Sequence, residues 1–343
     1  MKELLIGDLH WGEKNNSPKF HGQVMDFLKW VRELAESRHI ERCIQLGDWY
    51  HHRNKLDVAT VNASIQGAKL LGDTFGKENV WVLLGNHDLY YLNRLDVHSL
   101  KTIQSFVTVI DSPTETPDGT GIVIPWITDG EMWDRVVDMG DEYDYLFSHL
   151  ELNGFQVNDQ YTMEHGFSHR ELRGYNRVLT GHYHSRQTKD NITYVGTPYP
   201  ITMNEANEAH GVYILDTETG ELEFVEYTGI RVVSIPYTEI DTIEDYDPEN
   251  TSIRVEFPDD LEDETVITDV QNLLKEKNFQ ESKIKYTAKK VRELLEADVS
   301  EVSEVQNIDE VVLKFLDSSI EVDGVDKSLL KELYREAKAQ EDE

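Results

Sequence analysis

The chain has 343 residues and a formal net charge of −33 at pH 7, from 66 acidic and 33 basic side chains. Its hydrophobic content of 39% suffices for a core, and its length predicts two or three domains. Such acidity argues against a freestanding nucleic-acid binder, because the long-range field repels phosphate. The single cysteine, Cys43, excludes an internal disulfide and is interpreted as a buried core thiol.

The chain enters an apolar run at once, without a basic leader, and no apolar stretch reaches the roughly 18–20 residues that span a bilayer. We therefore expect a soluble cytoplasmic protein that is not secreted. Acidic side chains concentrate in 239–264 and 293–343, and these runs are interpreted as solvated surface.

Five apolar runs predict short buried strands that each end in Asp, Asn or His. The runs are 4–10, 43–48, 80–88, 145–149 and 177–184. Open α/β sheets place their sites outside the carboxyl ends of the strands, so we expect these ends to converge. Oxygen and imidazole ligands without a thiolate suit ions such as Mn²⁺, Fe²⁺ or Zn²⁺.

Amphipathic patterns predict helices over 20–37 and 58–71, between the first strands. This alternation indicates a central sheet with helices on both faces. Segments 192–195, 211–215 and 222–227 predict antiparallel strands, with a hairpin turn at 216–220.

A change of character near Ile230 predicts a second, acidic unit with strand 252–257, helix 264–276 and strand 283–286. Beyond residue 288, two apolar stripes separated by a turn at Asp323 and Gly324 predict helices. We expect three parts, covering residues 1–228, 229–288 and 289–343.

The ligand types follow from the strand ends. Alternation of side chains along an extended chain predicts that Asp8 and His10 share one side. Gly85-Asn86-His87-Asp88 is a stronger signal, because Asn86 supplies a neutral oxygen ligand and His87 a proton donor. Most histidines are expected to be ordinary polar residues, namely His21, His39, His52, His98, His165, His169 and His210.

Taken in order, the motifs Asp-x-His, Gly-Asp, Gly-Asn-His-Asp, His and Gly-His-x-His resemble the calcineurin-like binuclear metallophosphoesterases over residues 1–228. Gly47-Asp48-Trp49-Tyr50-His51 and the run 194–198 resemble the SbcD-type nuclease subunit of DNA double-strand-break repair complexes. The tailed-phage recombination endonuclease small subunits are the most similar group. The resemblance implies a four-layer α/β/β/α sandwich with a small α+β cap domain and a C-terminal helical tail.

The resemblance also implies two divalent ions, with Mn²⁺ expected and Mg²⁺, Fe²⁺ or Zn²⁺ as alternatives. Asp48 would bridge them. The first ion would be held by Asp8, His10, Asp48 and His184, and the second by Asp48, Asn86, His149 and His182. His87 would act as the acid, Asp88 would hold the His87 ring, and His51 would position the substrate.

Contacts with DNA and a partner are expected outside the metal centre. Five basic side chains follow the metal motifs, Lys14, Lys19, Arg53, Lys55 and Arg94, and each is equally well explained as solvated charge. The C-terminal stripes would dock on an SMC-like ABC ATPase through Val311, Phe315, Leu329 and Leu333, or pack within their own domain. The family implies a homodimer within a heterotetramer.

The leading hypothesis is a metal-dependent DNA exonuclease or endonuclease acting with this ATPase in double-strand-break repair, recombination and replication. The chain would then work in the host cytoplasm if it is phage-encoded. A phosphatase or phosphodiesterase on small or protein substrates is the main alternative, since a fold alone does not determine the substrate. A catalytically silent scaffold for the ATPase is the third.

Overall fold

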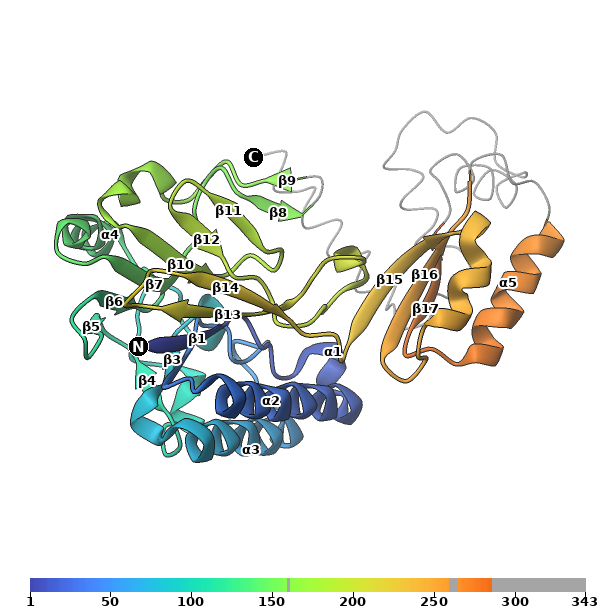
Figure 1. Cartoon of the computed structure of the whole chain (residues 1–343), viewed down its shortest axis with the longest axis horizontal. Helices are drawn as coiled ribbons and strands as arrows, with labels where there is room; N and C mark the ends of the chain where they lie inside the picture. The colour runs from blue at the N-terminus through green and yellow to red at the C-terminus, as the bar shows by residue number, and fades with distance from the viewer. Residues whose placement is uncertain (159–160, 259–263, 286–343) are drawn as a thin grey trace. The chain divides into compact units, whose positions relative to one another are not determined.

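Two six-stranded sheets form the body of the protein in the computed structural model, which describes residues 1–158, 161–258 and 264–285 (Figure 1). The chain divides into two compact units, 1–256 with 262–285, and 257–261 with 286–343. Only Phe257 and Pro258 of the second unit are described, so the structural account concerns the first. The expected C-terminal helices, with Val311, Phe315, Leu329 and Leu333, lie outside the described residues.

The first sheet has the order β14-β13-β1-β2-β3-β4. Its parallel strands are β1 (Lys2–Ile6), β2 (Arg42–Gln45), β3 (Val80–Leu83) and β4 (Thr108–Ile110). The hairpin of β13 (Gly211–Asp216) and β14 (Leu222–Glu226) adds to β1 in antiparallel register, which confirms the predicted turn between them.

The second sheet has the order β11-β12-β10-β7-β6-β5. Its parallel strands are β6 (Gly121–Ile124), β7 (Tyr145–His149), β10 (Arg177–Gly181) and β12 (Ile192–Tyr194). The edges β5 (Thr114–Glu115) and β11 (Gln187–Lys189) are antiparallel to their neighbours. A separate pair, β8 (Gln156–Asn158) and β9 (Tyr161–Thr162), lies in the connection after β7.

Three hydrophobic cores separate the layers. Leu5, Ile44, Phe147 and Leu179 share a core to which both sheets contribute, which places the two sheets face to face. Leu4 belongs instead to the core beneath the helices α2 (Pro18–Arg38) and α3 (Val58–Phe75), as expected where successive side chains of a strand point to opposite faces.

On the other side, α4 (Gly130–Asp138) and the 3-10 helix η5 (His169–Gly174) cover the second sheet, with Trp133 and Leu172 in the third core. The α/β class and both long helices are confirmed. The expectation of one central sheet is wrong, because the chain after β4 starts a second sheet instead of extending the first. Segment 192–195 was expected to be antiparallel, but β12 pairs parallel with β10 and antiparallel only with β11.

A three-stranded sheet follows, with β15 (Arg231–Pro236), β16 (Thr251–Glu256) and β17 (Ser282–Lys285) all parallel. Helix α5 (Glu264–Lys277) connects β16 to β17, so the predicted β-α-β order is confirmed and β15 is an additional strand. The four-residue α1 (Glu13–Asn16) and short 3-10 turns complete the described elements. The turns are η1 (Lys77–Asn79), η2 (Asn86–Asp88), η3 (Ser99–Thr102), η4 (Met139–Asp141), η6 (Met203–Glu205) and η7 (Tyr237–Asp245).

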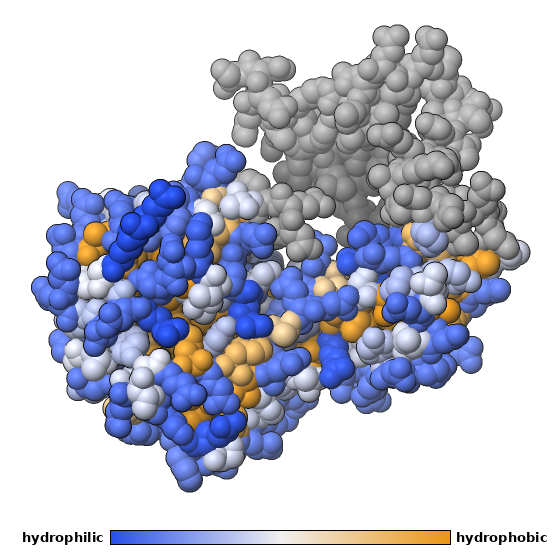
Figure 2. All heavy atoms as spheres, turned by 45° about the horizontal axis from the view of Figure 1, so that its top comes forward, coloured by the Kyte–Doolittle hydropathy of each residue, from blue (hydrophilic) through white to orange (hydrophobic). Residues whose placement is uncertain are grey.

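One face of the protein is mainly polar. Hydrophilic side chains cover most of the face seen in Figure 2, with smaller hydrophobic areas between them. Within the described ranges, no helix is both long and apolar enough to cross a membrane.

Candidate metal centre

All seven expected metal ligands lie at the ends of five parallel strands or in the loops that follow them. Asp8, Asp48 and Asn86 come after β1, β2 and β3 of the first sheet, whereas His149 ends β7 and His182 follows β10 of the second. The centre is therefore built across the two sheets, and the convergence expected at the strand ends is present.

The first group joins Asp8, His10, Asp48 and His184. His10 Nε2 lies 3.1 Å from His184 Nε2 and 3.9 Å from an oxygen of both Asp8 and Asp48. Ligand atoms bound to one ion at about 2.0–2.2 Å stand at similar separations. Two facing imidazole nitrogens are also satisfied by one cation placed between them.

The second group joins Asp48, Asn86, His149 and His182. Asn86 Oδ1 lies 3.0 Å from His149 Nε2 and 3.1 Å from His182 Nδ1. Asp48 Oδ2 lies 3.4 Å from His149 Nε2 and is the same oxygen that faces His10. Asp48 is thus the member common to both groups.

His149, His182 and His184 each have a polar partner at one ring nitrogen, and this partner orients the ring. His149 Nδ1 donates to the carbonyl of Leu46 at 2.7 Å, so the lone pair of the neutral ring is on Nε2, which faces Asp48. His182 Nε2 lies 3.5 Å from Glu151, and His184 Nδ1 lies 3.6 Å from Glu205. Such outer partners are typical of metal-binding histidines, because they select the tautomer.

The backbone at the site is strained and tightly packed. His10, Asp48 and His182 have φ angles of 50°, 54° and 99°, a region that non-glycine residues rarely adopt and that recurs at functional sites. A Cβ on Gly85 would lie 2.3 Å from Asp48 N, and one on Gly181 would lie 2.5 Å from Asp8 Oδ1. Glycine is therefore needed for the loops to approach each other.

Burial makes the charge balance of the centre depend on cations. Asp8 and Asp48 are 0% and 2% exposed. Burial raises the pKa of Asp8 to about 7, although nearby His149 opposes the shift. The histidines His149 and His10 overcome the effect of burial at Asp48 and lower its pKa. In turn Asp48 and Asp8, against burial, raise the pKa of His149 to about 9.

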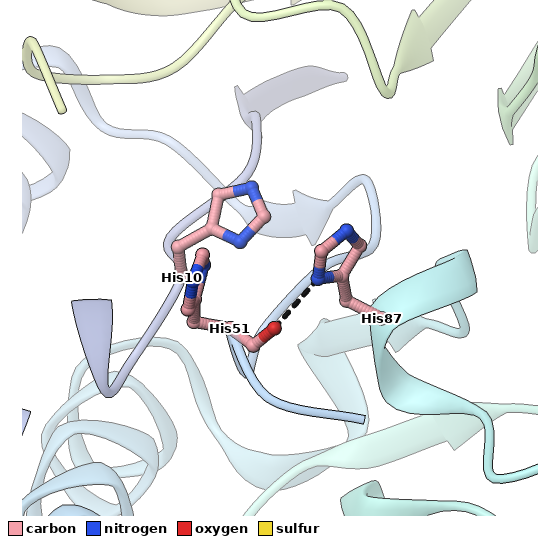
Figure 3. A group of neighbouring side chains, drawn as sticks. All are labelled: His10, His51 and His87. Carbon is pink, nitrogen blue, oxygen red and sulfur yellow. Dashed lines mark hydrogen bonds between the residues drawn. The ribbon is translucent and has the colours of Figure 1, made fainter. Parts of the chain in front are cut away.

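His87 and His51 lie beside the first group, and Figure 3 shows their rings and that of His10 turned toward a common space. The ring centroid of His10 lies 5.3 Å from that of His51 and 5.2 Å from that of His87. His87 N donates to Asp48 Oδ1 at 2.8 Å, and His87 Nδ1 donates to the carbonyl of His51 at 2.6 Å.

Asp88 differs from the expectation that it holds the His87 ring. Its buried carboxylate instead accepts from Gly85 N at 3.1 Å, Tyr50 N at 3.1 Å and Trp49 N at 3.3 Å. Asp88 therefore ties the loop after β3 to the loop after β2, because three backbone donors face it.

The predicted geometry of Asp8 and His10 is also wrong in detail. β1 ends at Ile6, and the positive φ of His10 shows that these residues are not extended. They approach each other through a loop that pairs with the next one, since His10 N donates to the carbonyl of Asp48 at 3.0 Å.

Three carboxylates in contact with site histidines were not found from the sequence: Glu13, Glu151 and Glu205. Glu13 Oε2 lies 2.7 Å from His51 Nε2. Glu205 completes a capping box with Thr202, a signature visible in the sequence, but nothing in that signature predicts its approach to His184. Trp126, Glu151 and Phe167 line a small pocket beside His149.

The five basic residues that were expected to contact DNA have different environments in the structure. Lys14 lies 3.4 Å from Glu281, and Arg94 forms two hydrogen bonds to Asp96, at 2.6 and 2.5 Å. Lys19 and Lys55 are exposed, and Arg53 is partly buried. Their role at DNA stays a prediction.

An α/β protein with a candidate metal centre at the strand ends is thus defined. Across 352 aligned positions the chain is 27% identical to "Exonuclease subunit 1" of Enterobacteria phage T4, covering 98% of this chain and 99% of that protein. No family model matches the chain. The resemblance to a phage nuclease subunit of the SbcD type, expected from the motifs, is confirmed by this near full-length similarity.

Proposed function

We propose that the chain is a metal-dependent DNA nuclease subunit built on the binuclear metallophosphoesterase sandwich. The observation that carries the proposal is the sharing of Asp48 Oδ2 between the His10 and His149 groups. Two groups that overlap at one carboxylate suit a pair of ions about 3.5–4 Å apart. The exonuclease name of the phage relative supports DNA as the substrate.

In this proposal Asp8, His10 and His184 hold one ion, Asn86, His149 and His182 hold the other, and Asp48 bridges them. When bound, the ions supply a hydroxide nucleophile and neutralise charge on the phosphate, with Mn²⁺ as the expected metal. Asp48 is suited to bridging because its lowered pKa keeps it anionic despite burial by the surrounding loops.

His87 and His51 act on the substrate in this proposal. His87 is fixed at both its backbone and its ring, so its outer nitrogen is held in a constant direction. When its ring carries a proton on both nitrogens, it donates the Nε2 proton to the leaving 3′ oxygen or stabilises the charge on the phosphate. His51, 32% exposed at the side chain, lies on the adjacent side and positions the substrate.

The whole protein is proposed to work with a partner. The relative is named as a subunit, and a net charge of −33 leaves this chain poorly suited to attract DNA alone. We propose an SMC-like ABC ATPase, docked on residues 289–343, in a heterotetramer with two copies of this chain. The unit at 229–288 is the proposed DNA-facing cap.

A nuclease assay tests the function. Purified protein with Mn²⁺ is expected to degrade linear DNA, with and without the partner ATPase, and to lose this activity with chelator. A metal series identifies the preferred ion. Hydrolysis of p-nitrophenyl phosphate without cleavage of any DNA substrate would favour the phosphatase, and no hydrolysis of either would favour the silent scaffold.

A further inference from the structure

We propose that Glu13 is a positioning residue for His51. A left-handed turn in the chain holds Glu13 in place. The inference deepens the proposed nuclease function and rests on it. It assigns a role to a side chain that belongs to neither ligand group.

The contact between the two side chains is direct. Glu13 Oε2 lies 2.7 Å from His51 Nε2, and the side chains are 19% and 32% exposed. His51 Nε2–H therefore donates to the carboxylate. His51 Nδ1 is buried and has no hydrogen-bond partner among the described residues. Glu13 thus selects the tautomer in which a neutral His51 keeps a free lone pair on Nδ1.

His51 is also linked to the acid. Its carbonyl accepts from His87 Nδ1, and its ring centroid lies 5.7 Å from that of His87 (Figure 3). A displacement of His51 would consequently disturb two groups of the site. Glu13 is the side chain that ties the His51 ring to the loop after β1.

The turn that carries Glu13 is unusual. Lys14, Asn15 and Asn16 have φ angles of 54°, 55° and 57°, and Gly12 before them has 101°. Three consecutive non-glycine residues in the left-handed region are unfavourable, and such strain persists only where surrounding contacts enforce it.

The enforcing contacts are present. Thr60 Oγ1 on α3 donates to Asn16 Oδ1 at 2.8 Å, and His21 Nε2 on α2 lies 3.0 Å from the same hydroxyl. Glu13 N donates to the carbonyl of His10 at 3.0 Å, and Asn16 N to that of Gly12 at 3.0 Å. Both long helices thus hold a turn whose first residue reaches His51.

The pKa of Glu13 is consistent with a fixed pair between this carboxylate and the His51 ring. Burial by itself raises the pKa of Glu13, but the hydrogen bond and charge interaction with His51, together with those of Lys14, outweigh it and the pKa is lowered. Glu13 is therefore anionic at neutral pH and remains an acceptor for the His51 ring. A carboxylate placed only for solubility would not need this contact.

The test combines a spectroscopic readout with kinetics in the full chain, using Glu13→Met and Glu13→Gln. Nitrogen-15 NMR of the His51 ring is expected to show the Nε2–H form in the wild type and in Glu13→Gln, where an oxygen acceptor remains. Glu13→Met is expected to lose that form. It should also lower kcat/KM on DNA on the order of 10-fold, because the positioned group moves, while calorimetry still finds two Mn²⁺ ions.

Two controls separate positioning from fold and charge. Asn15→Gly relieves strain on the same turn, and Glu33→Gln removes a charge from the exposed face of α2. Both are expected to behave as wild type. An unchanged His51 tautomer in Glu13→Met, or unchanged or raised kcat/KM, would overturn the inference. Absence of Mn²⁺-dependent cleavage in the wild type would refute the proposed function, and the NMR result would still decide on Glu13.

Discussion

In the proposed metal centre, Asp8 would make metal binding depend on pH. Its pKa is raised to about 7 by burial, so below pH 7 a proton competes with the first ion for the carboxylate. The affinity for the second ion is expected to rise up to about pH 9, where His149 loses its proton. The affinity for the first ion is expected to rise up to about pH 7, as Asp8 releases one proton. Calorimetry in buffers of different ionisation enthalpy measures that proton.

In the metal-free protein, the raised pKa of Asp8 makes the folded state less stable as the pH rises. Because the pKa of Asp8 is higher in the folded than in the unfolded chain, the free energy of unfolding falls as pH rises from about 4 to 7. Chemical denaturation with chelator present checks this direction. A free energy that rises through that window, with Asp8→Asn flat, would contradict the assignment.

His87 provides the second test at this scale. His87→Ser is expected to remove DNA cleavage by on the order of 10²–10⁴-fold, the usual contribution of a general acid. Both ions should stay bound, since His87 is in neither ligand group. Retained cleavage with two bound ions would show that another group protonates the leaving oxygen.

At this scale the sequence predicted ligand identities better than contacts. Asp, Asn and His after apolar runs identify donors, because the sites of open α/β sheets lie outside the carboxyl ends of the strands. Contacts of Glu13 and Asp88 depend on how two loops meet, and loop pairing leaves no pattern within either segment. Asp88 was assigned to its sequence neighbour for that reason.

The loops after β2 and β3 form an element that tolerates no added volume. Gly85→Ala would put a Cβ 2.3 Å from both Asp48 N and Asp48 Oδ1, so the bridging carboxylate must move. We expect at least a tenfold loss of Mn²⁺ affinity, and calorimetry measures it. Gly22→Ala on α2 is the matched control.

At Gly22 a Cβ would meet no atom within 4 Å. Because alanine is the better helix former, Gly22→Ala should raise the free energy of unfolding by about 0.5–1 kcal/mol and leave the metal affinity unchanged. Equal losses in both variants would indicate a general sensitivity of the protein to glycine replacement.

Elements with a strong periodicity were predicted well, as for α2, where the apolar positions continue over several turns. The sheet to which each strand belongs was not predicted. β6, β7 and β10 have the same buried apolar character as β1 to β3, so composition does not tell which sheet a strand joins. That depends on long-range pairing.

For the whole molecule, the partner-docking proposal gives a deletion test. Removing residues from about 300 onward is expected to abolish binding to the ATPase while two Mn²⁺ ions still bind. A pull-down with the purified ATPase and calorimetry measure the two effects. Unchanged pull-down would place the docking surface elsewhere, and loss of both would mean that the tail is needed for folding.

The position of Asp48 between ligands of both sheets has a mechanical consequence. Ions held as proposed, by residues that follow β1 to β3 and by residues at the ends of β7 and β10, would link the two sheets across the core that they share. Ligands that bind only the closed arrangement stabilise it by mass action, about 2.7 kcal/mol at 100 times the dissociation constant. A chelated protein should therefore exchange amide hydrogens faster along the inner faces of both sheets than along α2 and α3.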